Sequence, residues 1–340
     1  MKIFSKIKNK AGKEKFSVGL DIGTASVKMA KLKLSENIPE LCAFCLEPSQ
    51  LDLAGVLKKL KSTYSLETVN ISFTGPSTVT RYVNMPKMDY AEFKQALKFE
   101  AQKYIPFSAS EVNLDGCILR DNLPDNKMLV LIAAVKKEAV EQRLKLLQEA
   151  GLSARAIDID AVAITNGFSF TLAQDASLKQ KACALLDIGA SVASLAVLEC
   201  GALVLSRDIH IAGNAITQKI MDIFGVDFKA AELLKIRPGA QDAAKLNAAL
   251  ESVMASLAGE IRTSFDYYES QSASTVSGIF LSGGAADFAG LKDNLANFLG
   301  IEVVPRDPLK GLRLAANIAP EALKGISGKL AVAMGLALRS

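Results

Sequence analysis

A short pattern that occurs twice constrains the fold of this chain more than any other feature. Residues 18–27 read Val-Gly-Leu-Asp-Ile-Gly-Thr-Ala-Ser-Val, and residues 184–192 read Ala-Leu-Leu-Asp-Ile-Gly-Ala-Ser-Val, which places Asp21 and Asp187 166 residues apart. In each copy an apolar run ends in aspartate, passes a glycine and returns to an apolar run, as in a β-hairpin. One such hairpin occurs in many folds and by itself predicts no function. Two copies half a chain apart predict a duplicated fold with two similar lobes.

The turns of these hairpins carry the residue types that a phosphate-binding loop requires. Gly23 and Gly189 have no side chain, so the backbone N–H groups beside them can approach phosphate oxygens closely. Asp21 and Asp187 offer carboxylate oxygens, the ligands that Mg²⁺ prefers. If the two lobes face each other, the pattern predicts a cleft with a phosphate loop and a carboxylate on each side.

A third glycine motif follows an apolar run in the second half. Residues 278–282 have the composition of a buried strand, Gly283 and Gly284 come next, and a helix is expected from about Phe288. Paired glycines let a nucleoside lie against bare backbone. An ordinary strand-to-helix connection explains the same residues, so both interpretations stay open.

Two insertions interrupt the duplicated pattern. The first holds helices expected at 89–104 and 136–150 and strands expected at 112–119 and 128–135. Asp89 can cap the first of these helices, Pro106 stops it, and Gly151 ends the second. The second insertion holds helices expected at 213–224, 229–235 and 243–269.

These features predict an α/β fold with two duplicated lobes around a nucleotide cleft. The expected parts are a basic flexible tail at 1–15, a first-lobe core at 16–76 and 152–182, an inserted α/β subdomain at 77–151, a second-lobe core at 183–211 and 276–340, and a helical insertion at 212–275. The chain is 50% hydrophobic, enough for more than one core. Its longest apolar runs, such as 129–135, are far shorter than the roughly 18 to 20 residues of a membrane-spanning helix, so we expect no transmembrane segment.

The positive charge of the chain is concentrated in its tail. Residues 1–15 hold six lysines and one glutamate, a larger net charge than the +4 of the whole chain, so the remainder is close to neutral. A nucleic-acid-binding protein spreads Lys and Arg over a face or groove, and we expect no nucleic-acid partner. The tail lacks the apolar core of a secretion signal, which predicts a cytoplasmic protein. Ile3, Phe4 and Ile7 leave open both a solvated tail and contact with an anionic membrane.

The cysteines and the one histidine argue against metal or redox chemistry. The five cysteines are scattered through apolar runs, as buried thiols of a reducing compartment are: Cys42, Cys45, Cys117, Cys183 and Cys200. Cys42 and Cys45 have the spacing of a redox motif, but no second pair or neighbouring histidine completes a zinc site, since His210 is the sole histidine.

At the two hairpins the sequence resembles the actin-like ATPases, and in particular the PilM proteins of the FtsA/PilM family, from about residue 16 onward. Further segments carry the resemblance: Met85-Pro86, residues 100–107, residues 206–209 with Gly213 and Asn214, residues 231–235 and residues 331–338. The resemblance implies an actin-like ATPase fold whose inserted subdomain has the relocated position found in this family. It also implies ATP and Mg²⁺ in the cleft.

The resemblance assigns roles to particular residues. The residues it implies for nucleotide binding are Asp21, Gly23, Thr24, Ala25, Ser26, Asp187, Gly189, Gly213, Asn214, Glu232, Lys235, Gly283 and Gly284, with Asp21 and Asp187 at the metal, directly or through water. Glu232 and Lys235 are one helical turn apart, so a solvated ion pair explains them equally. Asp160 lies where relatives orient the attacking water, or it caps the next helix.

The chain also departs from the family pattern after Asp187. Ser191, Val192 and Ala193 stand where relatives often carry an acidic residue and threonines, and Ala285 stands where a third glycine is common. Fewer hydroxyl groups near the phosphates predict slow hydrolysis at most, while nucleotide binding is retained.

The partner implied by the resemblance is the N-terminal cytoplasmic peptide of a PilN-type inner-membrane protein, bound in a groove beside residues 77–151. Through it the chain would lie at the inner membrane and join the pilus assembly ATPase machinery; self-association is also open. Tyr104, Ile105 and Phe107 cluster where Pro106 ends a helix, and they either line this groove or seal the subdomain's own core.

Three other functions compete with a pilus scaffold. An FtsA-like division protein is the nearest, although its membrane anchor follows a linker and this sequence ends soon after an apolar segment. A sugar or acetate-type kinase shares the superfold but needs a catalytic base beside an acceptor pocket, and nothing marks one here. The cytoplasmic domain of a type II secretion L protein would continue into a membrane span.

Overall fold

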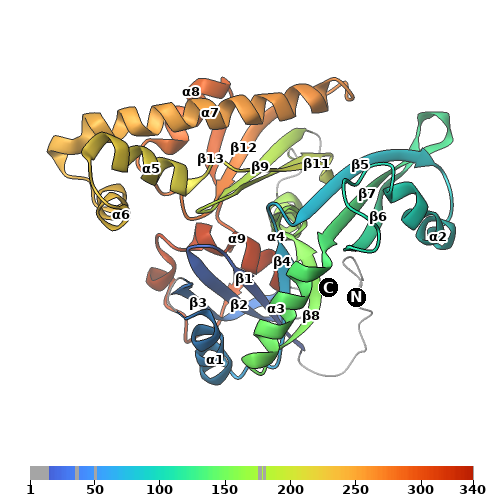
Figure 1. Cartoon of the computed structure of the whole chain (residues 1–340), viewed down its shortest axis with the longest axis horizontal. Helices are drawn as coiled ribbons and strands as arrows, with labels where there is room; N and C mark the ends of the chain where they lie inside the picture. The colour runs from blue at the N-terminus through green and yellow to red at the C-terminus, as the bar shows by residue number, and fades with distance from the viewer. Residues whose placement is uncertain (1–14, 35–37, 50–51, 175–177, 179–180, 340) are drawn as a thin grey trace.

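Two lobes and a smaller subdomain make up the molecule (Figure 1). The computed structural model describes residues 15–34, 38–49, 52–174, 178 and 181–339. The predicted basic tail lies outside the described residues apart from Lys15, the first residue of a strand. Among the described helices, none combines the length and the apolar character needed to span a membrane.

The first lobe is built on a six-stranded sheet of order β14-β3-β2-β1-β4-β8. Its strands are β1 (Lys15–Ile22), β2 (Ser26–Leu34), β3 (Glu40–Pro48), β4 (Thr68–Phe73), β8 (Ser153–Ile159) and β14 (Arg313–Leu314). Helices α1 (Leu53–Tyr64) and α3 (Lys137–Glu149) share one buried cluster with the sheet. The predicted first hairpin is confirmed as the antiparallel pair β1 and β2.

The second lobe repeats this arrangement with a sheet of order β11-β10-β9-β12-β13. Its strands are β9 (Ala182–Ile188), β10 (Ala193–Glu199), β11 (Ala202–Ile209), β12 (Val276–Ser282) and β13 (Glu302–Pro305). In both lobes the hairpin strands are antiparallel, and the first of them pairs in parallel with the strand on its other side. The structure therefore confirms the predicted duplication.

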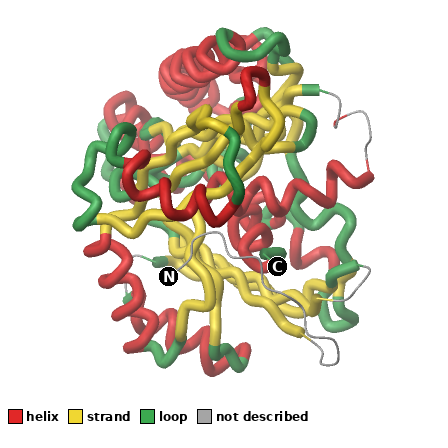
Figure 2. Tube along the Cα trace, turned by 90° about the vertical axis from the view of Figure 1, so that its right-hand side faces the viewer, coloured by secondary structure: helices red, strands yellow, loops and turns green. Residues whose placement is uncertain are grey.

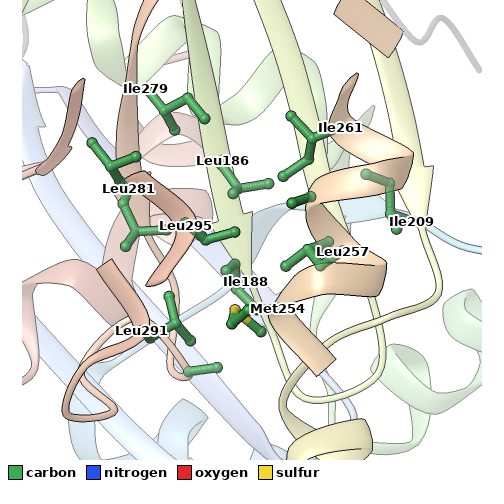
Figure 3. Close-up of a cluster of buried hydrophobic side chains, with 14 of the residues drawn as sticks. Leu186, Ile188, Ile209, Met254, Leu257, Ile261, Ile279, Leu281, Leu291 and Leu295 are labelled. Carbon is green, nitrogen blue, oxygen red and sulfur yellow. The ribbon is translucent and has the colours of Figure 1, made fainter. Parts of the chain in front are cut away.

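Helices of the second lobe cover one face of its sheet. They are α5 (Gly213–Phe224), α6 (Phe228–Ile236), α7 (Ala243–Glu269) and α8 (Leu291–Leu299). Figure 3 shows side chains of β9, β12, α7 and α8 meeting in the core, where Leu186, Met254 and Leu295 are fully buried. α8 begins three residues later than predicted, because Gly290 has a positive φ of 82° directly before it.

The inserted subdomain is a three-stranded antiparallel sheet, β5-β7-β6, with one helix. Its elements are β5 (Thr78–Pro86), α2 (Tyr90–Ala101), β6 (Val112–Leu123) and β7 (Lys127–Lys136). Asp89 and Glu92 form a capping box at the start of α2. The helix ends at Ala101 rather than at the predicted Tyr104, since the chain enters a turn before Pro106. Short 3₁₀ segments lie at Pro124–Asn126, Ala240–Asp242, Pro320–Leu323 and Ser327–Leu330.

Two parts of the expected domain division differ from the packing. The sequence predicts that α3 belongs to the inserted subdomain, yet its buried Val140 and Leu147 belong to the first-lobe core. It also predicts that residues 276–340 all belong to the second lobe, yet β14 pairs with β3 and helix α9 (Ala331–Ala337) packs on the first-lobe sheet. The contact is close, because a Cβ on Gly19 would lie 1.9 Å from the Ala333 carbonyl oxygen.

Helices α9 and α4 (Asp160–Gln174) pack against each other between the two sheets. Figure 2, turned by 90°, shows the same two-lobed outline from the side. α4 follows β8 of the first lobe and also contacts β9, β10 and β11 of the second. Any movement of one lobe against the other therefore acts on α4, whose first residue is Asp160.

Candidate functional site

The two hairpin turns have the same backbone geometry. In the first, the Gly23 N–H donates to the Ser26 carbonyl oxygen at 3.1 Å, and in the second the Gly189 N–H donates to the Val192 carbonyl oxygen at 3.0 Å. A Cβ on Gly23 would lie 2.9 Å from the Lys28 ammonium nitrogen, so that space is filled by a cation instead. A Cβ on Gly189 would lie 3.0 Å from the Val192 carbonyl oxygen, so both turns are too tight for a side chain at this position.

Lys28 is a site residue that the sequence analysis missed. It lies opposite Asp21 in the β1–β2 register, and its Nζ is 3.0 Å from the Asp21 carboxylate. Burial lowers the pKa of Lys28, but the Asp21 ion pair, with Asp187 and Asp160 nearby, outweighs it and raises the pKa above the ordinary value. The signal in the sequence was the strand alternation, which sets Lys28 on the same face as Asp21.

Asp187 occupies the equivalent position in the second hairpin. The Ser282 hydroxyl donates to its Oδ2 at 2.8 Å. Burial raises the pKa of Asp187 to about 6, and the charge of Asp21 acts in the same direction. The positive charge of Lys28 opposes this and lowers the pKa of Asp187. The structure therefore brings Asp21, Lys28 and Asp187 to one place between the lobes.

Asp160 lies at the same place, as the first residue of α4. Its carboxylate accepts a hydrogen bond from Ser72 on β4, and burial together with the neighbouring charge of Asp21 raises its pKa well above the ordinary value. A half-buried carboxylate held by a hydroxyl group can position a water molecule. The role of Asp160 as the residue that orients the attacking water remains a prediction.

The glycine motif after β12 closes the site on the second-lobe side. Gly283 has a positive φ of 97°, and a Cβ there would lie 2.4 Å from the Ile188 carbonyl oxygen. A side chain is therefore excluded at Gly283. A Cβ on Gly284 would meet nothing within 4 Å, so its backbone borders open space, as a nucleoside platform requires.

Gly213 and Asn214, at the start of α5, are brought directly to the second turn. The Gly213 N–H donates to the Gly189 carbonyl oxygen at 3.0 Å, and the Asn214 N–H donates to the Ala190 carbonyl oxygen at 2.7 Å. The Asn214 side-chain amide also donates to the Ser191 hydroxyl at 3.2 Å. These bonds fix the turn on the helix.

Glu232 and Lys235 form an ion pair on α6 that is half-buried rather than free in solvent. The Lys235 ammonium donates to the Thr217 hydroxyl at 2.7 Å and to the Gly213 carbonyl oxygen at 3.4 Å. The pair therefore fastens α6 to α5 beside the second turn. Whether it also touches a nucleotide stays a prediction.

Asp208 on β11 joins the lobes and was also missed. It accepts hydrogen bonds from the Thr74 hydroxyl at 2.7 Å, the Gly75 N–H at 2.7 Å and the Ser194 hydroxyl at 3.0 Å. Thr74 and Gly75 follow β4 of the first lobe, while Ser194 lies on β10 of the second. The segment 206–209 was noted in the sequence, but its spatial partners were not.

A cavity of about 330 Å³ lies beside Asp160 and Asp208. It is lined by the segment after β4, by the first residues of β5 and by the end of β11, with Phe73, Gly75, Val79, Arg81, Ser206 and His210 among its residues. The Thr78 hydroxyl, which belongs to this lining, is buried without a hydrogen-bond partner. The cavity therefore has an unsatisfied polar group and residues from all three parts of the molecule.

The apolar cluster at the end of α2 lies against the subdomain core. Ile105 is buried in the subdomain core, and Phe107 packs against that core with the Lys136 ammonium 4.9 Å from its ring centroid. Tyr104 is 37% exposed. For Ile105 and Phe107 the structure matches the alternative given above, in which they seal the subdomain.

The described residues hold no group of three or more His, Cys, Asp or Glu side chains that could bind a metal ion. Asp21 and Asp187 provide two carboxylates, and their role at a metal ion stays a prediction.

Comparison with known proteins identifies a family whose sequence model matches this chain. The sequence model of the family described as type IV pilus assembly protein PilM matches residues 19–340. The chain is similar to a solved structure described as a PilM-PilN type IV pilus biogenesis complex, with 28% identity, a TM-score of 0.84, and coverage of 95% of this chain and 98% of that chain.

Two more distant structures show the fold alone. Ethanolamine utilization protein EutJ from Carboxydothermus hydrogenoformans is 15% identical, with a TM-score of 0.56 and coverage of 99% of this chain and 93% of that chain. MreB5 of Spiroplasma citri, in a structure bound to AMPPNP, is 12% identical, with a TM-score of 0.51 and coverage of 95% of both chains. The predicted actin-like ATPase fold is confirmed.

Proposed function

Because this chain belongs to the PilM family of type IV pilus assembly proteins, we propose that it is an ATP-binding scaffold of pilus assembly rather than a division protein or a kinase. The observation that carries the proposal is the likeness, over 95% of the chain, to the structure of a PilM-PilN complex. In this role the protein works in the cytoplasm at the inner membrane and presents a nucleotide-dependent surface to a PilN-type protein.

The donor set of the cleft fits ATP with Mg²⁺. The backbone N–H groups of both turns and the Lys28 ammonium would hold phosphate oxygens, and the open backbone at Gly284 would face the nucleoside. Asp21 and Asp187 would hold Mg²⁺, which neutralises phosphate charge when bound. The lobes would then be tied together by a ligand as well as by Asp208.

In this proposal slow turnover is expected because few hydroxyl groups border the phosphates and Asp160 is the candidate base. Burial and the charge of Asp21 raise the pKa of its carboxylate, which disfavours the ionised form that accepts a proton from water. The second turn contributes Ser191 as its one hydroxyl side chain. We expect steady-state phosphate release well below the enzyme median of about 10 s⁻¹, measured by a coupled phosphate assay; release near that median would argue for an enzyme.

The PilN-type peptide is assigned to the cavity beside β5 rather than to the Tyr104–Phe107 cluster. The cavity has a volume suited to a few side chains, about 330 Å³, and the unsatisfied Thr78 hydroxyl offers a hydrogen bond to a bound peptide. Ile105 is already part of the subdomain core.

Calorimetry with a synthetic peptide from the cytoplasmic N-terminus of the PilN-type protein of the same organism tests the assignment. Wild type should bind with micromolar affinity, and Val79→Glu in the cavity lining should weaken binding by about tenfold or more. Phe99→Glu, on a side chain that is 74% exposed on α2, is the matched control and should bind normally. If wild type does not bind the peptide, the proposed partner is wrong. If Phe107→Glu weakens binding and Val79→Glu does not, the peptide binds at the end of α2 instead.

A further inference from the structure

Arg143 brings a positive charge to the edge of the first-lobe sheet that carries the site. Its guanidinium carbon is 5.3 Å from the ring centroid of Phe73, the last residue of β4. Phe73 pairs with Ile159 of β8, so Asp160 follows at the same edge. β1 pairs in parallel with β4 on its other side, which brings Asp21 there as well.

No hydrogen bond or ion pair with a described residue satisfies the Arg143 guanidinium. Its neighbours are the Phe73 ring and, at longer range, the carboxylates of Asp21 and Asp160; burial lowers the pKa of Arg143, and both carboxylates oppose this. Lys28, the other cation near these carboxylates, is already paired with Asp21 at 3.0 Å. A half-buried guanidinium with unused N–H donors is suited to a phosphate group, which it can contact with two parallel bonds.

The position of Arg143 in the chain gives this charge a connection to the inserted subdomain. α3 begins at Lys137, directly after β7 ends at Lys136. Phe73 lies just before the segment that enters β5. Arg143 and Phe73 thus lie on the two first-lobe elements, α3 and β4, that border the chain connections to the subdomain.

We propose that Arg143 contacts the terminal phosphate of the bound nucleotide and so makes the cleft prefer ATP over ADP. The inference rests on the proposed nucleotide-binding function and adds to it the residue that reads the terminal phosphate. The guanidinium fork donates N–H bonds to phosphate oxygens that ADP does not have at that place. Through its contact with Phe73, Arg143 then links the presence of this phosphate to the chain segment that leads from β4 into the subdomain.

The test compares ATP and ADP affinity, each with Mg²⁺, by calorimetry. Wild type, Arg143→Gln, Arg143→Lys and the control Lys145→Gln, an exposed residue of the same helix, are measured at one pH. In Arg143→Gln the affinity for ATP should fall by about tenfold or more while that for ADP changes by less than about twofold. Arg143→Lys keeps the charge without the fork and should lie between, and Lys145→Gln should match wild type.

Several outcomes overturn the inference. An equal loss for ATP and ADP in Arg143→Gln means that the residue does not read the terminal phosphate, and unchanged affinities mean that it packs on Phe73 and nothing more. Either result leaves the nucleotide-binding function intact, since wild type still binds. If wild type binds neither nucleotide, the proposed function and this inference fall together. Should Arg143→Gln fail to fold, Arg143→Lys decides: its preference for ATP over ADP should be smaller than that of wild type, and an unchanged preference would overturn the inference.

Discussion

The two hairpins share a turn but differ in the residue that faces the aspartate. Lys28 lies opposite Asp21 in the first hairpin, while Ser194 lies opposite Asp187 in the second. Asp21 is therefore ion-paired, and Asp187 has a hydroxyl neighbour, Ser282, and a raised pKa. The duplicated backbone provides two similar phosphate loops. Because of the facing residue, the first hairpin supplies a cation, whereas the second supplies a carboxylate that faces a hydroxyl group.

The largest effect is expected when the first hairpin is made like the second. Lys28→Ser should weaken ATP binding by roughly 100-fold, because the cation proposed to contact phosphate oxygens is lost and Asp21, whose side chain is 13% exposed, loses its ion pair. Calorimetry with ATP-Mg²⁺ measures this. The matched control is Ser194→Ala, at the equivalent position of the second hairpin, which should change affinity by less than about threefold. Similar losses in both variants would mean that the two hairpins are not distinguished by these residues.

The next effect concerns stability of the nucleotide-free and metal-free protein. The unfolded chain releases the Asp187 proton near its ordinary pKa of 3.8, while the folded protein holds it until about pH 6. The folded state thus binds more protons between these values, and the free energy of unfolding should fall as the pH rises through them. The loss is about 2 kcal/mol. Urea unfolding from pH 4 to 7 should show this fall in the free energy of unfolding in wild type and not in Asp187→Asn. The same pH dependence in both proteins would contradict the raised pKa of Asp187.

A smaller effect separates the metal from the phosphates. Asp187→Ala should weaken ATP-Mg²⁺ binding by at least about tenfold, or roughly 1.4 kcal/mol. The same substitution should have little effect on the affinity for ATP measured in EDTA, because no metal ion is then present for the carboxylate to bind. An equal loss with and without Mg²⁺ would exclude Asp187 as a metal ligand.

The smallest effects should come from the groups that brace each turn. The Ser49 hydroxyl donates to the Thr24 carbonyl oxygen at 2.7 Å in the first turn, and the Asn214 amide donates to the Ser191 hydroxyl at 3.2 Å in the second. Neutral hydrogen bonds contribute about 1 kcal/mol, so Ser49→Ala and Asn214→Ala should each weaken ATP binding by about fivefold or less. Losses that equal that of Lys28→Ser would show that turn rigidity, not charge, governs affinity.

The sequence predicted the hairpins and most helices, because helical spacing and apolar runs depend only on residues within one element. α5 and α7 have the bounds expected from helical spacing, and the apolar runs ending in Asp21 and Asp187 are strands. Spacing within an element settles such features without knowledge of its neighbours.

The rest of the site depends on contacts between distant segments. Lys28 was missed because its partner is set by register across the hairpin, and Asp208 because Thr74 and Gly75 come from the other lobe. Arg143 lies on a helix that the sequence assigned to the wrong core. An apolar helix such as α9 has the same pattern whichever sheet it covers, so its return to the first lobe could not be read from periodicity.

The return of the chain to the first lobe sets an order for its synthesis and folding. Ala30, Leu32 and Leu41 of the first-lobe sheet are buried by Leu330, Ala333 and Met334. A ribosome makes residues 313–339 after all other described segments, so the lobe that emerges first keeps one apolar face uncovered until the last. The second lobe has its whole sheet by Pro305 and can fold earlier. In the nascent chain the inner face of β2 and β3 therefore stays uncovered until residues 313–339 have been made, and exposed apolar surface of this kind is prone to aggregation.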